Sequence, residues 1–155
     1  MMKKILYLIS ILTITLLVSG CTDNSASVTG DALIRDNDDL KSDSIKIPLA
    51  GITFDINKFE YDADGTEVKY FIMKGADGQI HTAFDACDVC GGKLGYTQRG
   101  NDVVCKSCGR VFRIDDLGTK NIGGGCWPGY LAHTIDGDNI IIKISELNDG
   151  AFRFR

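Results

Sequence analysis

Two cysteine pairs of the same design carry the chemistry that this sequence suggests. They read Cys87-Asp88-Val89-Cys90-Gly91 and Cys105-Lys106-Ser107-Cys108-Gly109, and we call each stretch a knuckle. The two-residue gap allows both thiolates of a pair to reach one ion or cluster. The glycine that follows admits backbone conformations that turn amide N–H groups toward the sulfurs. Because four thiolates at one point repel one another without a cation, the pattern predicts a metal centre with four ligands: Cys87, Cys90, Cys105 and Cys108.

The residue types leave the occupant of this centre open. Four cysteines suit structural zinc and also an iron–sulfur cluster, whereas two disulfides or four free thiols are the alternatives without a metal. Three basic side chains flank the pairs, namely Lys93, Lys106 and Arg110. They either offset part of the thiolate charge and raise a cluster's potential or are ordinary solvated surface charges.

Composition limits the partners and the fold class. The chain of 155 residues is long enough for one domain with flanking segments. Its net charge is −4 and it has no basic stripe, which argues against nucleic acid as a partner. The 18 glycines fall largely in turn signals and there are only 2 prolines, so the sequence favours a turn-rich all-β fold with short strands.

The N-terminal residues 1–20 have the pattern of a lipoprotein signal peptide. Lys3 and Lys4 precede an apolar run, Ile5 to Val18, that is short for a membrane span. Small residues then lead directly into Cys21, which resembles a bacterial lipobox. The resemblance implies a diacylglycerol on the Cys21 sulfur and a chain tethered at the extracytoplasmic face of the cell membrane. An uncleaved anchor helix with an incidental cysteine is the alternative.

Residues 21–44 are predicted to be the lipidated cysteine and an acidic flexible linker, and residues 45–155 the folded domain. The linker is rich in Ser, Asp, Asn and Thr and has few large apolar residues, so it cannot bury enough surface to fold. A metal-collecting role for its acids is the alternative to a solvated tether.

Short strands and turns follow one another through the domain. We expect strands at 45–49, 67–74, 79–84, 94–98, 102–104, 111–114, 131–135 and 139–144, while 53–61 is ambiguous. Asp-Gly turns at 64–65 and 77–78 join neighbouring strands. The hairpins deliver the chain into each knuckle in turn, and the tail 151–155 is too short to interpret.

This order of strands, ligand loops and hairpins resembles a Rieske domain, a small β-sandwich or barrel. The Rieske text Gly-Gly-x-Leu matches Gly91-Gly92-Lys93-Leu94 after the first pair, and Phe112 follows the second pair as an aromatic residue does there. Cys90 and Cys108 stand where a Rieske domain has histidines. Four cysteines are expected to lower a cluster's potential toward ferredoxin values.

The chain also resembles the FtrD-like membrane iron–sulfur family. The matching text is Ala83 to Cys90, Cys105 to Gly109 and Gly123-Gly124-Gly125-Cys126-Trp127-Pro128. The resemblance implies a membrane-associated protein linked to bacterial iron transport. Some members carry several transmembrane helices before this domain, and this chain has a lipobox instead.

By the Rieske analogy, the glycine-rich loop 123–129 covers the centre. Cys126 is then a thiol beside the metal, an exchangeable ligand, a redox partner or simply a small buried residue. Trp127 is expected to pack against the knuckles and limit water access. His81 and His133 lie in or beside predicted strands, and we interpret them as strand residues because the cysteines already complete a four-coordinate set.

The favoured hypothesis is a membrane-anchored, extracytoplasmic electron carrier with an iron–sulfur cluster of the 2Fe-2S type. Its partner would be a redox or iron-transport protein. The alternatives are a structural-zinc binding module for a membrane or metal-transport partner and a protein that delivers a thiophilic ion. The sequence shows no Ser-His-Asp order and no phosphate-binding motif, so we expect a non-catalytic protein rather than an enzyme.

Overall fold

The computed structural model describes residues 42–155. The predicted signal peptide, Cys21 and most of the linker lie outside the described residues. Within them, no helix is long and apolar enough to cross a membrane.

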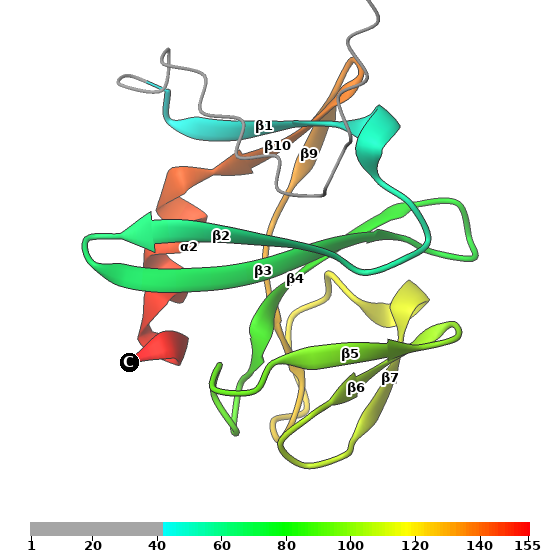
Figure 1. The fold of residues 1–155 in the computed structure, drawn as a ribbon, viewed down its shortest axis with the longest axis vertical. Coiled ribbons are helices and arrows are strands. Elements are labelled where there is room, and N and C mark those ends of the chain that lie inside the picture. The colour runs from blue at the N-terminus through cyan, green and yellow to red at the C-terminus, as the bar shows by residue number, and fades with distance from the viewer. Residues whose placement is uncertain (1–41) are drawn as a thin grey trace, which may run out of the picture. The chain divides into compact units, whose positions relative to one another are not determined.

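Residues 42–155 contain ten strands, all paired antiparallel, in three sheets (Figure 1). The first sheet has the order β1-β10-β9, from strands Ser44–Pro48, Asn139–Lys143 and Thr134–Asp136. The second has the order β2-β3-β4-β8, from Asn57–Ala63, Thr66–Lys74, Ile80–Cys87 and Pro128–Tyr130. The third has the order β5-β6-β7, from Tyr96–Arg99, Asp102–Cys105 and Val111–Arg113. The prediction of an all-β fold is therefore confirmed.

The second sheet is central, because side chains on its two faces belong to two different cores. On β3, Val68, Tyr70 and Ile72 enter one core, whereas Phe71 and Met73 enter the other. The first core lies against the β1-β10-β9 sheet and the C-terminal helix, since it includes Ile140, Ile142 and Leu147. The second core lies against the small β5-β6-β7 sheet and contains Cys87 and Cys105. Alternation along a strand thus separates a structural core from one that holds cysteines.

Most strand predictions agree with the structure, but the predicted strand 131–135 is wrong over residues 131–133, because β9 begins only at Thr134. The ambiguous segment 53–61 contains the start of β2, which pairs with β3 from Asn57↔Ile72 to Ala63↔Thr66. The glycine-rich loop ends earlier than expected, because Pro128 begins β8 beside Cys87. Proline is tolerated there as the first residue of a strand at the sheet edge.

The C-terminal segment is helical, whereas the sequence predicted a strand as far as Ile144 and left the tail 151–155 uninterpreted. α2 spans Ile144–Gly150 and the 3-10 turn η4 spans Ala151–Phe154. Two further 3-10 turns, η2 (Leu49–Gly51) and η3 (Ile114–Asp116), connect strands. Gly150 lets the helix approach the central sheet, since a β-carbon there would lie 2.0 Å from the Phe84 ring. The Phe154 ring packs edge-on against Phe84 at a centroid distance of 6.4 Å.

Candidate metal centre

The two knuckles are turns of the same kind at the ends of two strands. In the first, which follows β4, the Gly91 N–H donates to the Cys87 carbonyl at 2.9 Å. In the second, which follows β6, the Gly109 N–H donates to the Cys105 carbonyl at 2.8 Å. Both glycines have positive φ, 69° and 73°, a conformation that side chains disfavour. The unusual backbone conformation that the sequence predicted for these glycines is therefore confirmed.

Five sulfur atoms converge between the knuckles and the loop before β8. The thiols of Cys87, Cys90 and Cys126 lie within 4.8 Å of one another, and so do those of Cys90, Cys105 and Cys108. Cys126 is 4.0 Å from both Cys90 and Cys108. All five of these cysteines are free. The structure thus brings the four predicted ligands together and adds Cys126 to them.

The five thiols differ in how deeply they are buried. Cys87 and Cys105 are 1% and 2% exposed, because each ends a strand whose side chain points into the second core. Cys90 and Cys126 are half-buried, and Cys108 is exposed. A group held by these sulfurs would therefore be anchored in the core and reach the surface at Cys108.

Backbone amides and neighbouring thiols set the acidity of the cluster. Burial alone raises the pKa of Cys87, but the backbone N–H groups of Cys90 and Val89, together with the nearby Tyr96 hydroxyl and Cys90 thiol, outweigh burial and lower this pKa to about 7. The backbone at Arg110 lowers the pKa of Cys108. Desolvation raises the pKa values of Cys90 and Cys126, and the adjacent thiols add to the effect at Cys90. Each knuckle thus contains one sulfur prepared to carry negative charge.

The segment before β8 covers the sulfurs. Trp127 stands edge-on against Phe112, with ring centroids 5.4 Å apart. Its indole Nε1–H donates to the Thr119 carbonyl at 3.1 Å, and its own carbonyl accepts from the Asp88 N–H at 2.9 Å. The expectation that Trp127 packs beside the knuckles is confirmed by these contacts.

Asp88, between the first two cysteines, ties three segments together. Its carboxylate accepts from Arg153 at 3.0 Å and from the Asn121 amide at 3.1 Å. The Gly92 N–H also donates to the Arg153 carbonyl at 2.9 Å. Sequence reasoning missed Arg153, because a single arginine in a short tail gives no periodic signal.

The buried carboxylate of Asp85 stabilises the strands that carry the cysteines. Asp85 is 5% exposed and accepts from Lys58 Nζ and from the Tyr96 N–H, each at 2.6 Å. These contacts fix the start of β5 against β4. The Tyr96 ring is buried between Phe71 and Phe112. Its hydroxyl is the one buried side-chain polar atom of residues 42–155 without a hydrogen-bond partner. Burial and then the negative charge of Cys87 raise the pKa of Tyr96, so the hydroxyl keeps its proton.

The other residues singled out from the sequence lie away from the sulfurs or at the surface. Lys93, Lys106 and Arg110 are exposed. His81 lies in β4 and His133 just before β9, and neither belongs to the cysteine groups. His133 Nδ1 lies 2.9 Å from the Thr82 hydroxyl, and burial lowers the pKa of this histidine. These placements agree with their interpretation as strand residues, although His81 has further partners described below.

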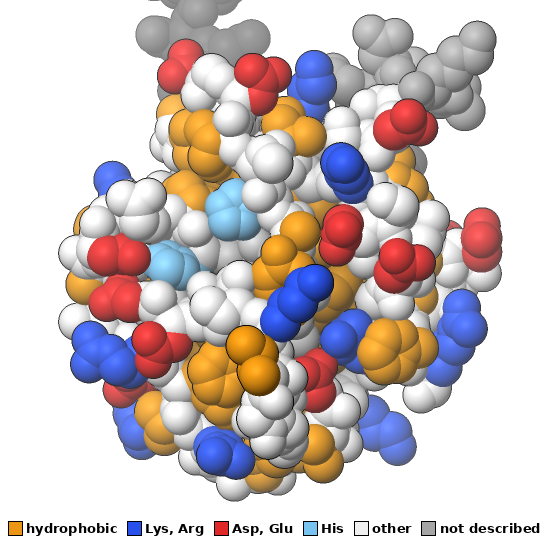
Figure 2. All heavy atoms as spheres, turned by 180° about the vertical axis from the view of Figure 1, so that it is seen from behind, with side chains coloured by type: hydrophobic (Ala, Val, Ile, Leu, Met, Phe, Trp, Pro, Cys, Tyr) orange, Lys and Arg blue, Asp and Glu red, His pale blue; other side chains and the backbone are white. Residues whose placement is uncertain are grey.

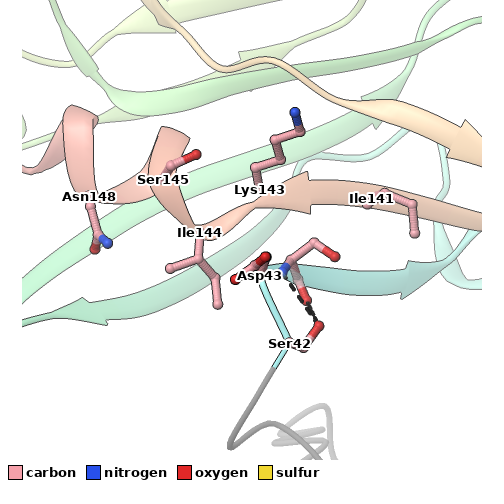
Figure 3. A pocket seen from close by; sticks show the side chains of 8 residues that line it. Ser42, Asp43, Ile141, Lys143, Ile144, Ser145 and Asn148 are labelled. Carbon is pink, nitrogen blue, oxygen red and sulfur yellow. Dashed lines mark hydrogen bonds between the residues drawn. The ribbon is translucent and has the colours of Figure 1, made fainter.

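A pocket elsewhere on the domain has a different character (Figure 3). It lies where β1 begins, beside the junction of β10 and α2. Its lining is Ser42, Asp43, Ser44, Ile141, Lys143, Ile144, Ser145 and Asn148. Figure 3 shows the Lys143 side chain directed away from Asp43. With no cysteine or histidine in its lining, this pocket offers no set of metal ligands comparable to the sulfur cluster.

The donor set of the cysteine cluster fits a thiophilic metal or an iron–sulfur cluster. All of its grouped ligand atoms are thiols, and an unpartnered hydroxyl donor, that of Tyr96, is buried with them in the same core. The family model of the membrane iron-sulfur containing protein FtrD-like family matches residues 53–154, which is more than half of the chain. The chain belongs to the FtrD-like family. The comparison with curated proteins found no match.

Family membership and the clustered cysteines together indicate that this FtrD-like chain binds a metal centre. The matched region begins before β2 and ends in η4, so it includes both knuckles, the covering segment and Arg153. It does not include the first strand, and the likeness to Rieske domains stays a prediction.

Proposed function

We propose that this FtrD-like protein is a membrane-anchored, extracytoplasmic electron carrier that works with iron transport. Cys87, Cys90, Cys105 and Cys108 would hold a 2Fe-2S cluster, which supplies reversible one-electron chemistry when it is bound. Lipidation at Cys21 would keep the domain at the membrane surface, with the acidic linker as a spacer. The partner would be a redox or iron-transport protein.

The observation that carries this proposal is the graded burial of the thiols. Electron transfer needs a cofactor that is shielded from water yet close to the surface at one edge. The core positions of Cys87 and Cys105 supply the shielding, and exposed Cys108 supplies the edge. A purely structural centre has no need for an exposed ligand.

Side chains around this edge support contact with a partner protein. Val89, at the tip of the first knuckle, is 65% exposed, and Ile122, in the covering segment, is 95% exposed. Such apolar side chains cost free energy in water and release it on docking. One lies between the first two cysteines and the other in the segment before β8, so both are available to a transient partner.

The second candidate is a structural-zinc module, and the short distances between sulfurs favour it. Zinc–sulfur bonds of about 2.3 Å in a tetrahedron place sulfurs about 3.8 Å apart. The sulfurs of three of the four predicted ligands, Cys90, Cys105 and Cys108, lie within 4.8 Å of one another, which is compact enough for a single zinc ion. A zinc ion would give a binding module for a membrane or metal-transport partner rather than an electron carrier.

Metal and sulfide analysis of full-length protein prepared without oxygen separates the two candidates. The proposal expects about two irons and two acid-labile sulfides per chain with a visible absorption spectrum. Cys105→Ser should abolish the colour, because Cys105 is a core ligand. Cys126→Ser should keep iron and sulfide, since four knuckle ligands remain. One zinc per chain without colour would overturn the electron-transfer proposal.

A further inference from the structure

We propose a second metal site, formed by Asp77, His81 and Asp115, that binds a first-row divalent cation such as Fe²⁺. It does not depend on what the cysteines hold. The three ligand atoms lie within 4.8 Å of one another. They come from the β3–β4 turn, from β4 and from η3, so the fold rather than a local sequence motif assembles them.

The Nε2 atom of His81 is placed to bind a positively charged partner. The side chain is more than nine-tenths buried, with 8% of the residue exposed. Its Nδ1 lies 3.1 Å from the Leu117 carbonyl, which can only accept, so Nδ1 carries the proton. Its Nε2 then faces only the Asp77 carboxylate oxygens, at 3.1 and 3.2 Å. Both ring nitrogens thus face acceptors, and a cation at Nε2 resolves the conflict.

The two carboxylates are oriented toward the same place. The Gln79 N–H donates to Asp77 Oδ1 at 2.8 Å, and the Ala76 N–H donates to Asp115 Oδ1 at 3.0 Å. Each carboxylate keeps lone pairs for a metal. The guanidinium of Arg113, 3.6 Å from Asp115 Oδ2, is 65% exposed and can be displaced at little cost.

Gly75 leaves space where the three donors converge. A β-carbon on residue 75 would lie 2.5 Å from Asp77 Oδ1, 2.6 Å from Asp115 Oδ1 and 2.8 Å from His81 Nε2. The structure gives no positive φ for this glycine, so backbone conformation does not require it. A glycine is needed at position 75 because any side chain there would collide with the three donor atoms. Small side-chain movements would bring such donors to metal-bond lengths of about 2.0–2.2 Å.

The donor types select the cation. One neutral imidazole and two carboxylates suit Fe²⁺, Mn²⁺ or Zn²⁺, and they differ from the all-sulfur cysteine cluster. Metal-binding histidines usually donate their other ring N–H to an acceptor that fixes the tautomer, and the Leu117 carbonyl is that acceptor for His81. Two carboxylates would balance the charge of a divalent ion.

The site lies at the other end of β4 from the cysteines. His81 and Cys87 are six residues apart on one strand and share a face, which corresponds to about 20 Å. Both histidines of the protein appear on the face in Figure 2, and acidic side chains lie beside one of them. The site is therefore open to ions from solvent and separate from the sulfur centre.

Manganese titration of full-length protein with its cysteine centre loaded tests the proposal. Mn²⁺ prefers oxygen and nitrogen over sulfur, and the paramagnetic resonance signal of the free ion falls when it binds. We expect one saturable site per chain. Asp77→Asn and Asp115→Asn should weaken binding at least about tenfold, and Gly75→Ala should do the same while keeping every ligand. Asp55→Asn, an exposed acid elsewhere, is the matched control and should bind as the parent does.

Nitrogen resonances of His81 supply a second measurement. Mn²⁺ should broaden the ring signals of His81 in proportion to the occupancy of the site. Ring signals that Mn²⁺ leaves unchanged would show that no metal ion binds at Nε2 and would overturn the site. Undiminished binding in both aspartate variants would also overturn it. Acid-labile sulfide and visible absorbance report on the cysteine centre alone and should be equal in all variants, so these outcomes do not bear on that centre.

Discussion

The guanidinium of Arg153 lies 3.0 Å from the carboxylate of Asp88, which joins the last turn of the chain to the first cysteine knuckle. Both side chains are largely enclosed, at 15% and 22% exposure. The guanidinium also covers the Phe84 ring at 5.0 Å, and the Arg153 carbonyl accepts from the Gly92 N–H. The C-terminal segment is thus part of the metal centre's support rather than a loose end.

Arg153→Met should therefore loosen the first knuckle. The substitution keeps much of the apolar contact but removes the charged hydrogen bonds to Asp88, each worth about 1.5–3 kcal/mol. We expect a lower free energy of unfolding and faster loss of metal to a chelator, measured by the decay of absorbance. Arg155→Met, two residues away and exposed, is the control. Equal rates for the two variants would contradict a supporting role for Arg153.

The Asp85–Lys58 pair gives a second prediction, about stability. Asp85→Asn removes the charge that Lys58 neutralises in a buried position, and the variant should lose about 1–3 kcal/mol in urea unfolding. Lys58→Met should cost at least as much, because it leaves the buried Asp85 carboxylate, 5% exposed, without its counter-charge. The comparison fails if the lysine variant is clearly the more stable of the two.

The cysteine pattern and the strand alternation explain how much the sequence could predict. The two-residue gaps and following glycines are local features, so the knuckles and their positive-φ turns could be read directly. The strand at 67–74 was predicted from a local pattern as well, and it forms β3. Fully buried Val68 and Phe71 show that each face meets a separate core.

Long-range partners could not be predicted in the same way. Arg153 reaches Asp88 across 65 residues, and His81 meets the Leu117 carbonyl across 36. Neither contact leaves a periodic trace in the sequence. The helical tail was missed because α2 is only seven residues long and buries just two of them, Leu147 and Gly150, which is too little for an amphipathic pattern.

Cysteine reactivity gives a third prediction, for metal-free, reduced protein. Cys108 is exposed and the backbone at Arg110 lowers its pKa, so at neutral pH more of it is thiolate than of an ordinary cysteine. We expect iodoacetamide to label Cys108 first, with the half-maximal rate at a pH below the ordinary thiol value. Cys126, whose pKa is raised by burial, should react later. Peptide mass spectrometry over time decides the order, and earlier labelling of Cys126 would contradict the assignment.

The unpartnered Tyr96 hydroxyl gives the fourth prediction, in which the metal-free and loaded proteins should respond differently. In the metal-free protein, Tyr96→Phe removes a buried hydroxyl that makes no hydrogen bond, so stability should stay equal or rise. In the loaded protein, the protonated hydroxyl can donate to a sulfur that carries more negative charge after reduction. Tyr96→Phe should then lower the reduction potential, because hydrogen bonds to cluster sulfurs raise it.

Potentiometry of loaded protein and thermal unfolding of metal-free protein measure the two halves of this prediction. Tyr70→Phe is the matched control, since Tyr70 is equally buried but lies in the core away from the cysteines. It should leave the potential unchanged. If Tyr96→Phe shifts the potential no more than Tyr70→Phe does, the hydroxyl plays no part in tuning the centre. A loss of stability in the metal-free variant would instead mean that the hydroxyl has a partner within the protein.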